Sequence, residues 1–139
     1  MKRKGNFSLY EKERNQEIYD YFKIIFSQKQ KKTIDEISVE ISKLPSKRFW
    51  VSRERAAIVI SQMLRGQSIE GMRPLKKQMY DEIYRRVLQK KAECPCYGIP
   101  RIVGIVVRQE APSFYLRPYS IRKILYRIIS GWYEKRKDL

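Results

Sequence analysis

FWVSRERAAIVISQMLRG, residues 49–66, decides the fold, because its apolar spacing is typical of an amphipathic helix and its pattern occurs twice. Shifted by sixty-five positions without a gap, it falls on FYLRPYSIRKILYRIISG, residues 114–131. Any two amphipathic helices match at apolar positions. Here the phenylalanines that precede the helices, Phe49 and Phe114, also coincide, and both segments end in glycine. The coinciding apolar residues are Ala56, Val59, Ile60, Met63 and Leu64 with Ile121, Ile124, Leu125, Ile128 and Ile129.

The same register continues upstream, where residues 17–19 and 82–84 share the sequence Glu-Ile-Tyr. Isoleucines at 34, 37 and 41 fall on apolar residues at 99, 102 and 106. An ungapped internal match of this length indicates a tandem duplication. We therefore predict an all-α fold of two tandem three-helix, helix-turn-helix-like units. These are a first half (1–66), a linker (67–73), a second half (74–131) and a basic C-terminal tail (132–139).

Capping residues place the helices of the first half. Ser8 with Glu11, and Thr33 with Glu36, have the spacing of capping boxes, so we expect helices to start at both sites. Pro45 ends the second helix, and Ser52 is the expected N-cap of the third helix, which Gly66 ends.

Prolines mark the helices of the second half. Pro74 suits the first position of a helix that runs to about Ala92, and Pro118 leads into a last helix that runs to about Tyr133. Residues 99–109 are ambiguous, because their β-branched content favours a strand whereas the repeat register favours a helix. We predict a helix.

The charge of the chain points to a polyanionic partner. Lys and Arg number 31 against 15 Asp and Glu, a net charge of +16 that exceeds what solubility needs. No apolar run is long enough for a signal peptide or a membrane span, so we expect a cytoplasmic protein, or a virion protein if the source is a phage. With no histidine and only Cys94 and Cys96, we expect neither a metal nor another cofactor.

An enzyme is not indicated. The chain has no histidine for general base work, no glycine-rich phosphate loop and no nucleophile motif. We therefore expect a protein without catalytic residues.

Basic residues on and before the third helix of each half suggest nucleic-acid binding, as in helix-turn-helix proteins. Arg and Gln can contact base edges, and Lys can neutralise phosphates. The connection before the third helix is longer than the turn of a helix-turn-helix motif, which weakens the case for base recognition but not the case for phosphate binding. The alternative is that these residues only form solvated helix faces and bind no nucleic acid. We expect DNA rather than RNA. The candidate residues are Lys47, Arg48, Arg53, Arg55, Gln62 and Arg65, with Arg117, Arg122, Lys123 and Arg127; Tyr126 shares their face.

Aromatic residues precede both third helices. Trp50 and Tyr115 occupy equivalent positions and suit either stacking on bases or anchoring the helix entry in the core. We favour the anchoring role.

The segment RFWVSRERAAIVI, residues 48–60, resembles stretches in small basic proteins of Bacteroidetes and their phages whose role is not established. The resemblance implies a bacterial or phage setting and transfers no functional residues. The alternative function is that of a helical structural or adaptor protein of a phage particle or other assembly, whose basic faces would meet acidic protein partners or packaged DNA.

Overall fold

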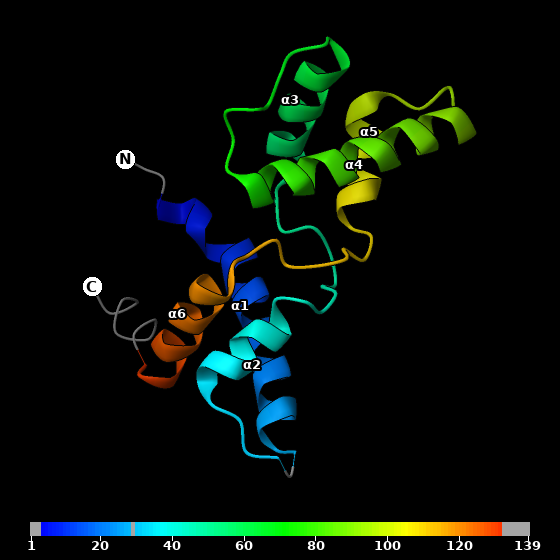
Figure 1. The fold of residues 1–139 in the computed structure, drawn as a ribbon. Helices are drawn as coiled ribbons and strands as arrows, with labels where there is room; N and C mark the ends of the chain where they lie inside the picture. The colour runs from blue at the N-terminus through cyan, green and yellow to red at the C-terminus, as the bar shows by residue number, and fades with distance from the viewer. Residues whose placement is uncertain (1–3, 29, 132–139) are drawn as a thin grey trace. The chain divides into compact units, whose positions relative to one another are not determined.

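The computed structural model describes residues 4–28 and 30–131, which form six helices and contain no strand (Figure 1). The predicted all-α class is confirmed for this part of the chain. In order, the helices are α1 (Lys4–Phe26), α2 (Ile34–Ile41), α3 (Arg53–Leu64), α4 (Pro74–Glu93), α5 (Ile99–Val107) and α6 (Pro118–Ile129). None of these helices is both long and apolar enough to cross a membrane.

The ambiguous run of residues 99–109 is helical over residues 99–107, as predicted, and residues 108–109 form a turn. Gly98 is the N-cap of α5 and Pro100 lies in its first turn, where a proline costs no hydrogen bond. Ile102, Val103 and Val106 are fully buried there. Burial against α3 and α4 outweighs the strand propensity of the β-branched side chains.

Three of the five predicted helix signals for the first half are confirmed, and α2 ends at Ile41, already before Pro45. Thr33 and Glu36 form both hydrogen bonds of a capping box, and Ser52 Oγ accepts from the Arg55 amide at 3.0 Å. Gly66 has the positive φ of +83° that ends a helix, and Gly131 has +77°. The start at Ser8 is wrong, because α1 already begins at Lys4.

The last helix is shorter than predicted. It ends at Ile129, before the left-handed Gly131, while the predicted end at Tyr133 lies outside the described residues. The bounds of α6 are those of α3 plus sixty-five at both ends, and their N-caps, Ser52 and Arg117, are related in the same way.

The chain folds into two compact units that do not coincide with its two halves. Unit 1 consists of Met1–Leu44 and Leu116–Leu139, and unit 2 of Pro45–Tyr115. Each third helix therefore packs away from its own half: α3 contacts α4 and α5, and α6 contacts α1 and α2. A boundary at Gly66 does not separate the units, because that residue lies inside unit 2.

This division also separates the second and third helices of each half, which the helix-turn-helix prediction had paired. α2 and α3 belong to different units, as do α5 and α6. The connections 42–52 and 108–117 are longer than the turns that join neighbouring helices of a bundle. They carry the chain out of unit 1 and back into it.

The core of unit 1 is a mainly aliphatic layer to which its three helices all contribute. The buried residues are Ile18, Phe22 and Ile25 of α1, Ile37 and Ile41 of α2, and Ile121, Ile124 and Leu125 of α6. The spacing on α6 is the apolar stripe predicted from the sequence. All eight would return to water if the unit opened, which makes their burial the main stabilising contribution.

The core of unit 2 extends from α3, α4 and α5 into both connections. Tyr80 and Phe49 are its largest fully buried side chains. Ser46 and Ala111 exchange two backbone hydrogen bonds of 2.9 Å, and the Phe49 amide donates to the Val107 carbonyl at 2.9 Å. These bonds hold the two connections side by side.

Arg86 of α4 fixes the connection that follows α5. Its guanidinium contacts the Glu82 carboxylate at 2.7 Å and the Glu110 carbonyl at 2.9 Å, and lies 5.0 Å from the centre of the Phe49 ring. Arg85 also donates to Glu82 at 2.7 Å. The hydrogen bond from Arg85 is the main cause that holds the pKa of Glu82 below its ordinary 4.5, with burial acting in the opposite direction.

A lowered pKa of Glu82 makes part of the stability of unit 2 depend on pH. The contribution is complete above the ordinary pKa of a glutamate and is lost as the pH falls through the lower folded pKa. Glu82→Gln should therefore lose less unfolding free energy than the parent between neutral pH and pH ~3, measured by urea unfolding. Glu54→Gln, at a carboxylate 74% exposed, is the matched control. Equal losses in parent and Glu82→Gln would contradict the assignment.

Candidate nucleic-acid interface

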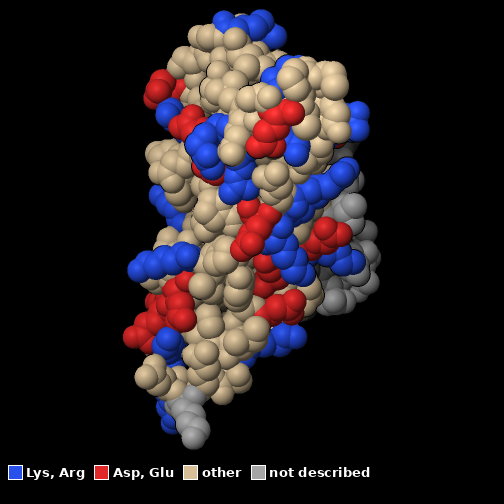
Figure 2. All heavy atoms as spheres, turned by 90° about the vertical axis from the view of Figure 1, so that its right-hand side faces the viewer, with Lys and Arg blue, Asp and Glu red and all other residues tan. Residues whose placement is uncertain are grey.

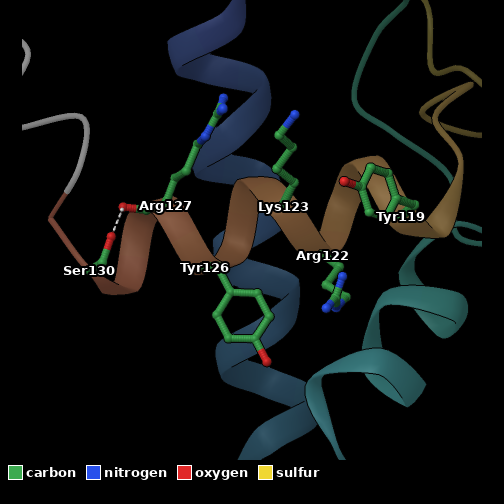
Figure 3. Close-up of a pocket in the computed structure, with 6 residues that line it drawn as sticks. All are labelled: Tyr119, Arg122, Lys123, Tyr126, Arg127 and Ser130. Carbon is green, nitrogen blue, oxygen red and sulfur yellow. Dashed lines mark hydrogen bonds between the residues drawn. The ribbon is translucent and has the colours of Figure 1, made fainter.

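The outward face of α6 carries an uninterrupted set of cationic and aromatic side chains. Tyr119 and Tyr126 are 60% and 48% exposed, two turns apart on the same side of the helix. Together with neighbouring residues they line an open hollow of about 310 Å³ (Figure 3). The lining residues are Tyr119, Arg122, Lys123, Tyr126, Arg127 and Ser130.

The cations lie on both sides of the two tyrosines. Figure 3 shows Lys123 and Arg127 projecting from one side of α6, with Arg122 and Tyr126 on the other. The Lys123 ammonium is 6.0 Å from the centre of the Tyr119 ring. Arg117 is the exposed N-cap residue of the same helix. Because residues 111–131 contain no Asp or Glu, no acid within this segment cancels the four positive charges.

Arg122 forms an ion pair within unit 1, whereas no ion pair is described for Lys123. Its guanidinium forms an ion pair of 2.7 Å with Asp35, in the first turn of α2. It also lies 5.4 Å from the ring centre of Tyr126 and 5.9 Å from that of Tyr119. Arg122 therefore positions the two tyrosines and ties α6 to α2, while its charge is partly neutralised.

The corresponding face of α3 has a different character. At positions sixty-five residues before those of the α6 face it carries Glu54, Ala57, Ile58, Ser61, Gln62 and Arg65. Ile58 is 54% exposed and Leu64 is 40% exposed. The two third helices share an apolar stripe, but only α6 has an outward face of cations and aromatics.

The other two arginines of α3 lie at the edges of that helix. The aliphatic chain of Arg53 covers Gly104 of α5, where an added Cβ would lie 2.9 Å from its Cδ, and its guanidinium contacts Glu54 at 3.3 Å. Arg55 lies beside the buried Tyr80 of α4. Burial raises the pKa of the Tyr80 phenol, and the charge and hydrogen bond of Arg55 oppose that effect.

The residues before α3 hold the connection in place. Arg48 donates to the carbonyls of Phe49 at 2.9 Å and Val51 at 3.1 Å, and its guanidinium lies 5.6 Å from the Trp50 ring centre. Trp50 Nε1 donates to Ser46 Oγ at 2.6 Å. Lys47 is exposed on the same connection. Through these contacts Arg48 stabilises the conformation of the connection before α3.

The phenylalanines before the third helices are buried more deeply than the aromatic residues that follow them, although Tyr115 also packs against the core of unit 2. Phe49 and Phe114 are buried at 1% and 4% exposure, whereas Trp50 and Tyr115 are half-buried. Tyr115 stacks on Phe49 with ring centres 6.2 Å apart. Its φ of +56° makes it the one non-glycine residue with positive φ in the described chain. Burial raises the pKa of its phenol, the Glu82 charge adds to this, and Arg86 opposes it.

The ten predicted residues are therefore divided between the units. In unit 1, α6 carries Arg122, Lys123 and Arg127, and Arg117 is its N-cap; the other six residues belong to unit 2. Tyr119 and Ser130 were missed as candidates, although their spacing from Lys123 and Tyr126 places them on the same helical face. That spacing was the available signal.

Charge elsewhere is mixed. On the face shown in Figure 2, Lys and Arg side chains alternate with Asp and Glu, so the positive excess does not form a uniform patch in that view. Cys94 and Cys96 are free, and the described residues contain no group of three or more His, Cys, Asp or Glu side chains suited to a metal ion.

Comparison of the chain with protein-family models, with curated proteins and with solved structures gives no match.

Proposed function

We propose that the chain binds nucleic acid without catalysing a reaction, chiefly through the outward face of α6. The observation that carries this proposal is the pair of exposed cations Arg117 and Lys123 beside two exposed tyrosines. Cations on one helical face can neutralise successive phosphates, and the released counterions provide the free energy of binding. The charge of +16 gives a polyanion a general attraction to the same protein.

The exposed tyrosines of α6 bear on whether the protein binds single-stranded or duplex nucleic acid. An exposed tyrosine offers a ring on which an unpaired base can stack, for about 1–3 kcal/mol per base. A helix with arginines and lysines on its outer face can also lie along duplex phosphates, with DNA as the expected partner. Single-stranded DNA, duplex DNA and RNA of equal length are therefore the probes that separate these modes.

The second candidate function is that of a structural or adaptor protein, favoured by the surface of α3. Ile58 and Leu64 expose apolar area on that helix. Such a surface suits a protein partner in an assembly, of phage or other origin. It can coexist with nucleic-acid binding at α6.

A tandem duplication is also part of the proposal. Supporting it are the bounds of α3 and α6, the left-handed Gly66 and Gly131, and the burial of Ile37 and Ile102 at the same register. The Ser46–Ala111 bridge joins two residues that are themselves sixty-five positions apart. On this account the two α-helical halves began alike and only the second acquired the cationic outer face.

Binding should weaken steeply with salt. If Arg117 and Lys123 each neutralise one phosphate, the logarithm of affinity should fall against the logarithm of salt with a slope of about −1.4 to −1.8. Fluorescence anisotropy with labelled probes at several salt concentrations measures it. The absence of binding to duplex DNA, single-stranded DNA and RNA at low ionic strength would favour the adaptor function instead.

A further inference from the structure

We infer that each half of the chain binds the other by exchanging third helices, so that the covalent tether of residues 67–73 is not needed to hold the halves together. Ile69 and Met72 of this tether pack in the core of unit 2. The inference concerns the assembly of the fold and is independent of the nucleic-acid proposal. Its basis is the packing of α3 and α6, each of which completes a unit whose other two helices belong to the opposite half.

The packing within each unit is complete only with the exchanged helix present. In unit 1, α6 contacts both α1 and α2; in unit 2, α3 contacts both α4 and α5. Ala56, Val59 and Ile60 of α3 are at most 1% exposed, so that face is covered. In α6, Ile121 and Leu125 at the corresponding positions are 0% exposed. Without its exchanged helix each helix pair would present an apolar face to water.

Backbone hydrogen bonds also join the halves. Ser46 belongs to the first half and Ala111 to the second, and each amide donates to the carbonyl of the other at 2.9 Å. The Phe49 amide donates to Val107, again across the halves, at 2.9 Å. None of these bonds, and none of the helix contacts, requires a covalent link between Gly66 and Pro74.

The tether can be cut after folding. Glu70 and Gly71 are exposed in a turn between α3 and α4, so a protease site inserted between them would be accessible to the enzyme. Circular dichroism before cleavage should match that of the parent chain. After cleavage the two fragments should elute together from a sizing column in native buffer and separate in guanidinium chloride. Separation in native buffer would overturn the inference.

Helix-specific variants identify the contacts that hold the fragments. Ala56→Asp places a charge in the covered face of α3, and Ile121→Asp does so at the equivalent position of α6. Each substitution alone should lower the affinity between the fragments at least tenfold, because the other exchanged helix still packs normally. Both substitutions together should release the fragments. If the double variant still elutes as a complex, the exchanged helices do not hold the halves together.

The chain offers a matched control on the same two helices. Leu64 and Ile129 are also sixty-five positions apart, and they are 40% and 51% exposed. Leu64→Asp with Ile129→Asp adds the same charge and should leave the cleaved fragments associated. Release by this control pair would show that general charge, and not the covered faces, governs association, and would overturn the inference.

Discussion

Leu125→Ala should accelerate amide hydrogen exchange in α1 and α2, and Ile60→Ala should accelerate it in α4 and α5. Both side chains are 0% exposed at equivalent positions of α6 and α3. Truncating a buried leucine or isoleucine to alanine costs about 2–5 kcal/mol, because burial is lost and a cavity remains. Amides that exchange through opening of the affected unit should then exchange roughly thirtyfold faster or more.

Mass spectrometry of peptic fragments assigns the accelerated exchange to particular helices. Leu64→Ala and Ile129→Ala, at the exposed equivalent positions, serve as controls and should change exchange little. If Leu125→Ala instead affects α4 and α5 while sparing α1 and α2, each third helix packs in its own half and the described units are wrong.

Neutralising Arg117 and Lys123 should have the largest effect on binding. Both residues are exposed on or beside the outward face of α6, so Arg117→Gln with Lys123→Gln should leave the fold unchanged. Loss of two charge-assisted phosphate contacts should lower affinity roughly tenfold to a hundredfold at low salt. It should also reduce the magnitude of the salt slope by about 1.5.

The matched control removes the same charge from the same unit. Lys12→Gln with Lys31→Gln alters two exposed lysines on α1 and on the segment before α2. This control should keep most of the affinity if the α6 face is the site. Equal losses in the two variants would mean that total charge, and not its placement on α6, governs binding.

The sequence was sufficient for the helices but not for their partners. Ser52, Gly66 and Pro74 act through their own backbone geometry, so local patterns placed the ends of α3 and the start of α4. An apolar stripe indicates which face of a helix is buried, but it does not indicate which other helices cover that face. Because α3 and α6 carry the same stripe, sequence alone could not tell which helix pair each would join.

The candidate site was predictable in outline only. Helical spacing predicted that Arg122, Lys123 and Arg127 lie near one another, and all three line the same hollow. It could not show that Arg122 pairs with Asp35, or that Arg53 lies across Gly104, since both contacts join segments distant in sequence. The position of a residue along a helix indicates whether its side chain is exposed. Which groups that side chain contacts depends on its neighbours in the tertiary structure.

The most direct test of the central claim compares the α6 face with the basic ends of the chain. One variant replaces Lys2, Arg3, Lys4, Lys135, Arg136 and Lys137 by Gln, and the other replaces only Arg117 and Lys123. Their affinities for one single-stranded and one duplex DNA probe are measured at the same low salt concentration. We predict that the first variant binds more tightly than the second although it has lost more charge. If the first variant loses binding and the second retains it, the basic ends bind nucleic acid and the face of α6 does not.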